Sequence, residues 1–220
     1  MIGMAAGFRA ESASPSVHRL KALPDMPYHM KSACRLLLRT SALYVLAAGV
    51  CFGGYLGFLQ LTGNFHTVVR GELYRSAQPS AAQLKDYVGR YGIKTVINLR
   101  GPENLADWYK AEVSTTQRLG VMHVDFALSS SRMVSEETAD VLLQIMKDAP
   151  KPILIHCKAG ADRSGIASAL YSYRIARIRA ETSEEQLSVF FGHIGIPHLS
   201  PAFAMDKSWE ALEDEAPKSG

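Results

Sequence analysis

The pattern of hydrophobic and polar positions sets one long apolar stretch apart from the rest of the chain. Residues 40–65 carry no charge, and residues 42–61 (ALYVLAAGVCFGGYLGFLQL) are largely apolar. At about 1.5 Å per residue, 20 helical residues cross the roughly 30 Å hydrocarbon core of a bilayer. We therefore expect an uncleaved transmembrane signal-anchor helix at residues 41–62. A cleaved signal peptide and a buried core helix are the alternatives.

Beyond this stretch, strand-like and helix-like runs alternate. Strands are predicted at 68–76 (a short strand or a hairpin around Gly71), 93–99, 121–128 and 152–156. Helices are predicted at 80–92, 104–119, 135–148, from the loop at Gly165 to about 179, and at 202–212. Ser80 with Gln83 predicts a capping box, and Ser135 predicts a second helix start. Such alternation is typical of an α/β fold, which we place at residues 66–212.

The charge distribution supports a membrane location. Residues 1–40 carry six basic and two acidic residues, a charge of +4, so the remainder of this +3 chain carries −1 (3 − 4). A near-neutral body does not favour a nucleic-acid partner. Positively charged flanks stay in the cytoplasm, so residues 1–40 are expected to form a disordered cytoplasmic tail and the folded domain to be periplasmic or extracytoplasmic. Arg70 and Arg75 lie on the far side of the span, and this weakens the prediction of the orientation. Residues 213–220 are expected to be a flexible tail.

Three glycines recur at every fourth position of the apolar stretch: Gly49, Gly53 and Gly57. This small-xxx-small spacing allows two membrane helices to approach closely. It predicts a homodimer through this stripe, although glycine is also common in spans without such contacts.

The chemistry of the chain is concentrated where residues 152–156 lead into a loop and then a helix. A loop between a strand end and a helix start aims successive N–H groups at one point, and the helix dipole adds positive potential there. Cys157 lies at the floor of this loop, where that field favours the thiolate nucleophile. Arg163 can grip two phosphate oxygens with its planar fork. Gly160 permits the backbone geometry, and Ser164 can donate a hydrogen bond to the sulfur when it leaves.

The residues 156–165, H-C-x-x-G-x-x-R-S-G, resemble the signature of the cysteine-dependent protein tyrosine phosphatases, in the bacterial dual-specificity-like branch. The segments 71–79 (GELYRSAQP) and 96–100 (VINLR) are similar to segments of the same branch. The resemblance covers roughly residues 66–200. It implies a central, mostly parallel sheet flanked by helices. The rhodanese fold offers a comparable cysteine cradle, but typically with a loop one residue shorter.

The resemblance also implies a reaction, the two-step hydrolysis of phosphomonoesters without a metal or another cofactor. Cys157 attacks phosphorus, and water then hydrolyses the cysteinyl-phosphate. His156 would tune and orient Cys157. The loop amides would bind the phosphate oxygens; these belong to Lys158, Ala159, Gly160, Ala161, Asp162 and Arg163.

The general acid departs from the family pattern. Members usually carry an aspartate on a separate loop, but residues 128–133 (LSSSRM) hold no carboxylate. Asp162, inside the signature, matches a position proposed as acid or base in some relatives. Asp125 lies just upstream of the expected acid loop and is the second candidate. The third interpretation is that no dedicated acid exists, so that only good leaving groups such as phenols react quickly.

The substrate is less defined than the reaction. Phosphotyrosine in proteins, with phosphoserine or phosphothreonine as further substrates, is the first expectation. A lipid or an envelope-glycan phosphate is the alternative for a domain held close to a bilayer. Lys158 matches a lysine of lipid-phosphatase relatives, but Ala161 replaces the second lysine of that pattern. A phosphate-binding module without turnover is the alternative from another class. The histidines lack the clustered spacing of a metal site.

Overall fold

The structure, a computed structural model, describes residues 28–213, with side chains described from residue 37 onward. The tail segments 1–27 and 214–220 therefore lie outside the described residues. The chain forms two units, residues 1–49 and residues 50–220. The described part of the first unit is the N-terminal portion of helix α1, and the second unit holds the last turns of α1 and the sheet.

Helix α1 runs over Tyr28–Leu61. Within it, Leu37–Leu61 is long and apolar enough to cross a membrane, judged by length and composition alone. Residues 28–40, where the sequence predicts a disordered tail, are helical instead. Their leucine, arginine and lysine residues are good helix formers, and they extend a helix that is already nucleated.

The second unit is built on a five-stranded sheet in the order β1-β2-β5-β3-β4. The strands are β1 (His66–Val69), β2 (Leu73–Ser76), β3 (Thr95–Asn98), β4 (Met122–Asp125) and β5 (Ile153–His156). Only β1 runs antiparallel, to β2, whereas β2, β5, β3 and β4 pair in parallel. The expectation of a mostly parallel sheet is confirmed. The carboxyl ends of the four parallel strands meet at one edge, with β5 between β2 and β3.

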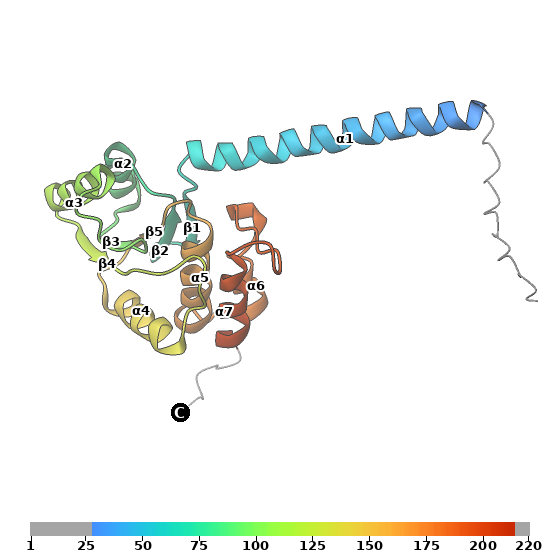
Figure 1. The fold of residues 1–220 in the computed structure, drawn as a ribbon. Helices are drawn as coiled ribbons and strands as arrows, with labels where there is room; N and C mark the ends of the chain where they lie inside the picture. Colours follow the sequence, from blue (N-terminus) through green and yellow to red (C-terminus); the bar gives the residue numbers. More distant parts are fainter. Residues whose placement is uncertain (1–27, 214–220) are drawn as a thin grey trace, which may run out of the picture. The chain divides into compact units, whose positions relative to one another are not determined.

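Helices cover both faces of this sheet (Figure 1). They are α2 (Ala81–Tyr91), α3 (Asp107–Leu119), α4 (Glu136–Asp148), α5 (Asp162–Leu170), α6 (Ala180–Glu184) and α7 (Phe203–Glu213). A 3-10 turn, η2, spans Val189–Phe191. The expected capping box of Ser80 and Gln83 is present at α2, and Ser135 caps α4.

The alternation of strand residues explains the two layers of the core. Ile153 and Ile155 point to one face and pack with residues of α4, α5 and α7. Leu154 points to the other face and packs with Leu84 and Tyr87 of α2. The sheet is thus buried on both sides, as a parallel sheet requires.

One predicted helix is wrong in extent. The helix after the signature loop does not continue to residue 179, because α5 ends at Leu170 and a π-helical turn, η1, follows at Tyr171–Ile175. The aromatic and β-branched residues of this turn (YSYRI) are weaker helix formers than the residues of α5. Tyr171 is fully buried, and its hydroxyl donates to Glu72 Oε2 at 2.8 Å.

Candidate active site

The signature loop lies at the centre of the carboxyl edge of the sheet. Cys157 follows β5 directly and is only 2% exposed, and α5 begins at Asp162. Because β5 lies between β2 and β3, residues that follow those two strands flank the loop on either side.

Arg75 of β2 holds one part of this loop from outside. Its Nη2 donates to the carbonyls of Gly160 and Ala161, at 2.8 and 2.9 Å. Its Nη1 donates to the carbonyl of Gln186 at 2.7 Å, and its guanidinium lies 4.2 Å from the ring centre of Phe191. Arg75 is fully buried, and no carboxylate forms an ion pair with it among the described residues. Burial lowers the pKa of Arg75 to about 9.

Donors near the end of α1 hold the preceding part of the loop. The carbonyl of Ala159 accepts from Asn64 Nδ2 at 2.9 Å and from Gln60 Nε2 at 3.2 Å. The carbonyl of Lys158 accepts from the backbone N–H of Gln78 at 3.3 Å. Four successive carbonyls, 158–161, therefore accept hydrogen bonds from residues outside the loop.

This arrangement determines where the loop amides point. In a trans peptide the C=O and N–H groups point in opposite directions. With carbonyls 158–161 turned toward their outer donors, the N–H groups of residues 159–162 point to the opposite side. These N–H groups lie at the N-terminus of α5, where the helix dipole also favours an anion. The loop therefore has the form of an anion cradle.

Gly160 is required at its position for two reasons. Its φ of +73° lies in the left-handed region, which residues with a Cβ rarely adopt. A Cβ there would also lie 2.5 Å from the backbone nitrogen of Ala77. Glycine is therefore what allows the loop to pack against the end of β2.

Arg163 and Ser164 carry polar atoms that the protein itself does not satisfy. Arg163 Nε and Ser164 Oγ are buried without a hydrogen-bond partner among the described residues. Within the described residues, Arg163 Nη1 makes two long contacts, 3.4 Å each, with the carbonyls of Leu99 and Leu128. Because buried polar groups are nearly always hydrogen-bonded, this placement suits a ligand with several acceptor oxygens.

His156 is oriented by a buried carboxylate from α3. Glu112 Oε1 accepts from His156 Nε2 at 3.0 Å and from His123 Nε2 at 2.8 Å, and Oε2 accepts from the Gln78 amide. Burial alone would raise the pKa of Glu112, but these hydrogen bonds outweigh it and lower the pKa to about 2. Glu112 is therefore ionised, and its hydrogen bond to Nε2 fixes the imidazole of His156, the residue before Cys157.

Asp162, the first candidate acid, lies at the start of α5 in a chain of three titratable side chains. His193 Nδ1 lies 2.8 Å from Asp162 Oδ1, and His193 Nε2 lies 3.0 Å from Asp206 Oδ2. Burial lowers the pKa of His193, but the two carboxylates outweigh this and raise it. A protonated His193 satisfies both carboxylates at once.

Asp125, the second candidate acid, ends β4 and is engaged at both oxygens. Oδ1 accepts from Asn98 Nδ2 at 2.8 Å, and Oδ2 accepts from the hydroxyl of Tyr109. This hydrogen bond and burial raise the pKa of Tyr109 to about 12, so the phenol remains the donor. Both acceptor oxygens of Asp125 are thus used in joining β4, β3 and α3.

The residues proposed from the sequence at 156–164 form one continuous site, and Asp125 lies apart on β4. Sequence analysis missed Arg75, Glu112 and His193 as parts of the site. Glu112 could have been found, because the buried positions Tyr109, Glu112 and Thr116 follow the helical repeat and place a carboxylate on a buried face. Arg75 lies in the segment 71–79 that resembles the family, but nothing local indicates its role or that of His193, since their partners are distant in the sequence.

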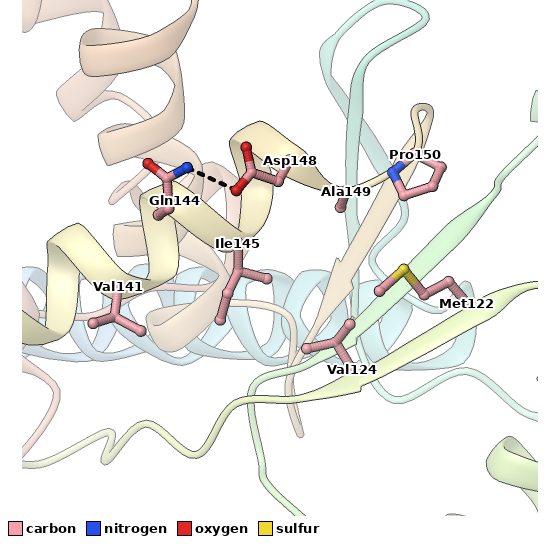
Figure 2. Close-up of a pocket in the computed structure, with 8 residues that line it drawn as sticks. All are labelled: Met122, Val124, Val141, Gln144, Ile145, Asp148, Ala149 and Pro150. Atoms are coloured by element: carbon pink, nitrogen blue, oxygen red, sulfur yellow. Dashed lines mark hydrogen bonds between the residues drawn. The ribbon is translucent and has the colours of Figure 1, made fainter.

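An apolar groove of about 440 Å³ lies at the other end of the strands (Figure 2). Met122 begins β4, and Ala149 and Pro150 precede β5, so the groove is at the amino ends of the parallel strands. Val141 and Ile145 of α4 form its other wall. Its polar residues, Gln144 and Asp148, hydrogen-bond to each other at 2.7 Å. The groove offers shape but no reactive group.

Solved structures share this fold. TpbA of P. aeruginosa matches with a TM-score of 0.53 and 21% identity, over 68% of this chain and 85% of that one. PTPMT1 matches with a TM-score of 0.52 and 17% identity, over 70% and 99% of the two chains. The core catalytic domain of the PP-IP phosphatase SIW14 from S. cerevisiae matches with a TM-score of 0.52 and 21% identity, over 69% of this chain and 91% of that one. Identities this low show the fold alone.

Sequence comparisons give the family. No curated protein matches the chain. The model of the tyrosine phosphatase family matches residues 53–180, which include the whole signature loop and all five strands. The chain therefore belongs to the cysteine-dependent tyrosine phosphatase family.

Proposed function

We propose that this chain is a membrane-anchored phosphatase that hydrolyses phosphotyrosine in proteins through a cysteinyl-phosphate intermediate. The observation that carries the proposal is the signature loop, whose carbonyls 158–161 are all turned outward while Cys157 lies at its floor. This loop can surround a phosphate dianion with N–H groups, and Arg163 supplies a bidentate contact.

In the first step, the Cys157 thiolate attacks phosphorus and the bond from phosphorus to the ester oxygen breaks. The leaving oxygen takes a proton, which releases the alcohol or phenol. The loop N–H groups and Arg163 bind the three remaining phosphate oxygens while phosphorus passes from the ester oxygen to the sulfur. His156, held by Glu112, keeps the strand end in place behind the sulfur.

In the second step, a water molecule attacks phosphorus and the sulfur–phosphorus bond breaks. Inorganic phosphate leaves, the proton of the water passes to a base, and Cys157 returns to the thiolate. The unpartnered hydroxyl of Ser164 can donate to the departing sulfur. This would stabilise the thiolate without protonating it.

Asp162 is the better candidate for acid and base. Asp125 has both oxygens engaged by Asn98 and Tyr109, which hold it in the joint between β4, β3 and α3. In the described part of the chain, Asp162 is engaged at Oδ1 by His193, and its side chain is 27% exposed. The proton shared with His193 can supply Asp162 in the first step and can be restored in the second.

The preference for phosphotyrosine rests on reach and on leaving-group chemistry. Cys157 is almost completely buried, which favours a long aryl phosphate over the shorter phosphoserine side chain. A phenol also needs less protonation to leave than an aliphatic alcohol. Among structures of this fold, TpbA has been solved with phosphotyrosine and PTPMT1 with PI(5)P. A lipid phosphate is the second candidate, because Gln60 in the candidate span hydrogen-bonds to the loop.

We further propose that residues 37–61 anchor the domain on the extracytoplasmic side, with residues 1–36 in the cytoplasm. The support is the apolar length of the helix and the basic residues on its N-terminal side. Protease added outside spheroplasts would degrade the domain in this orientation. Complete protection from the protease would show instead that the domain lies on the cytoplasmic side.

The function is tested by phosphate release from the purified full chain in lipid nanodiscs. The panel contains a phosphotyrosine peptide, an aryl phosphate and a phosphoinositide. We expect release from the first two, loss of more than about 10³-fold in Cys157→Ser, and no loss in the control Cys51→Ser, which removes an exposed thiol. If a folded protein binds vanadate but releases no phosphate from any substrate, it is a binding module and the enzymatic proposal is wrong.

A further inference from the structure

The segment before α7 combines an unusual composition with exposure. Residues 186–205 (QLSVFFGHIGIPHLSPAFAM) contain no aspartate, glutamate, lysine or arginine. Within them lie four exposed apolar side chains, Val189 (51%), Phe190 (58%), Ile196 (46%) and Leu199 (80%). We refer to residues 189–199 as the apolar loop. A surface loop of this composition is expected to be covered by something apolar.

The apolar loop is fixed to the last turns of α1. The hydroxyl of Tyr55 donates to the carbonyl of Phe190 at 2.6 Å, and Asn64 Nδ2 donates to the carbonyl of Phe191 at 2.8 Å. The side chain of Leu59, which is 4% exposed, lies against Gly192, where a Cβ would be 3.4 Å from Leu59 Cδ1. The loop therefore lies beside α1 at the level of residues 55–59.

This level coincides with one end of the candidate span. A bilayer takes about 20 helical residues. If the span begins at Thr40, just after Arg39, it ends near residue 59 and includes Tyr55. If it begins as early as Leu36, it still ends at Tyr55. In both cases Phe190 lies at the membrane interface or inside the hydrocarbon core.

From this geometry we propose that the apolar loop is a second membrane-contacting element, with Val189 and Phe190 inserted into the bilayer beside α1. The inference rests on the membrane anchorage proposed above. The occupant is lipid rather than a soluble partner, because the loop is continuous with the apolar surface of α1, where Phe58 and Leu61 are also exposed. An exposed aromatic residue such as Phe190, in a segment that itself holds no acidic or basic side chain, is typical of an interfacial contact.

The contact has a consequence for the active site. Asn64 bonds both to the apolar loop, at Phe191, and to the signature loop, at Ala159. One buried side chain thus joins the membrane-contacting surface to the phosphate cradle. This seats the cradle at the depth of lipid headgroups, so phosphate esters presented at the membrane surface reach it more readily than esters in bulk solution.

The test is a depth measurement by spin labelling in lipid nanodiscs. Cys34, Cys51 and Cys157 are replaced by serine, and a nitroxide is attached at Phe190→Cys or, as the matched control, at Val141→Cys, which is 54% exposed and lies on α4. We expect the label at 190 to be accessible to oxygen and shielded from a soluble nickel chelate, and the label at 141 to show the reverse. Equal accessibility at the two positions would overturn the proposal. So would spin–spin broadening at 190 together with low accessibility to oxygen, because the surface would then contact a second copy of the chain instead of lipid.

A double variant, Val189→Ser with Phe190→Ser, provides a second readout with the cysteines intact. Its release of phosphate from a soluble aryl phosphate is expected to stay within about twofold of the unaltered chain, whereas release from an ester embedded in vesicles falls about fivefold or more. Equal losses on both substrates would contradict a membrane role. If the unaltered chain hydrolyses neither substrate, the proposed function fails, and the depth measurement still decides the membrane contact.

Discussion

The two ends of the parallel strands carry side chains of opposite character. At the carboxyl ends, Arg75, Glu112 and His156 are fully buried polar groups next to Cys157. At the amino ends, the groove of Met122, Val124, Val141 and Ile145 is apolar (Figure 2). Both ends belong to one sheet and one core. The fully buried charged groups of the described residues, Arg75 and Glu112, thus lie toward the end that holds the signature loop, where a phosphate can offset the charge of Arg75.

Electrostatics explains why this asymmetry suits the reaction. A buried cation without a carboxylate partner is unfavourable in the free protein. Arg75 is such a cation, and both Cys157 and Asp162 act to raise its pKa against the effect of burial. A phosphate dianion in the loop adds negative charge to the same region. The cation therefore becomes more favourable when substrate is bound, which is when its field is needed.

The largest effect is expected from Arg75→Met. The variant removes the donors to the carbonyls of Gly160 and Ala161, so these peptide groups can rotate and misdirect their N–H neighbours. We expect kcat/KM for an aryl phosphate to fall about 10²-fold, which corresponds to about 2.7 kcal/mol. Steady-state kinetics in nanodiscs measures this. Arg90→Met, at an exposed arginine of α2, is the matched control and should be neutral.

Arg75→Lys separates charge from geometry at the same position. Lysine keeps the positive charge but cannot reproduce the planar fork that bonds several carbonyls. Partial recovery of kcat/KM relative to the methionine variant is expected. If Arg75→Met keeps kcat/KM within twofold of the unaltered chain, the loop does not need its outer donors.

The second effect concerns Glu112→Gln. The variant removes the ionised acceptor shared by His123 and His156, and we expect about tenfold lower kcat and about 2 kcal/mol lower stability at pH 7. The pKa of Glu112 is lowered from 4.5 to about 2, so its contribution is present above pH 4.5 and is lost as pH falls toward 2. Urea unfolding should show that the difference in unfolding free energy between the unaltered chain and Glu112→Gln is smaller at pH 3 than at pH 7. A constant difference would contradict an ionised Glu112.

Much of this architecture could be predicted because its signals are local. The capping box at Ser80, the cap at Ser135 and the strand-loop-helix around Cys157 are written in residues a few positions apart. The order of the strands and the outer donors of the loop are not local. Arg75 and Gly160 are far apart in the sequence, and only the parallel pairing of β2 with β5 brings them together.

The predictions on the general acid show the same limit. Both Asp125 and Asp162 were candidates, because strand alternation does not reveal which carboxylate is engaged by other side chains. The partners that distinguish them, Tyr109 and His193, come from α3 and from the loop before α7. Residues 194–201 likewise show no periodicity from which the position of His193 next to Asp162 could have been predicted.

A smaller effect is expected from His193→Gln. The pKa of His193 is raised above 6.5 in the folded protein, so its stabilising contact is fully present below pH 6.5 and is lost as pH rises through that raised value. The difference in unfolding free energy between the two proteins, about 1–2 kcal/mol at pH 6, should therefore shrink at alkaline pH. We also expect kcat to fall severalfold, with a changed pH profile, if His193 supplies the proton of Asp162. An unchanged pH profile would separate His193 from catalysis.

The smallest effect is expected at the amino ends of the strands, from Val141→Ser in the groove. Val141 is 54% exposed and has no role in the loop, so the free energy of unfolding should change by less than about 0.5 kcal/mol. Phosphate release should remain within twofold of the unaltered chain. This result matters because the comparison assumes that a change at the amino ends of the strands does not affect catalysis at the carboxyl ends. If a polar substitution in the groove changed kcat/KM fivefold without changing stability, the two ends would be coupled through α4 and the sheet. The apolar groove would then be a regulatory surface of the phosphatase rather than a passive part of its fold.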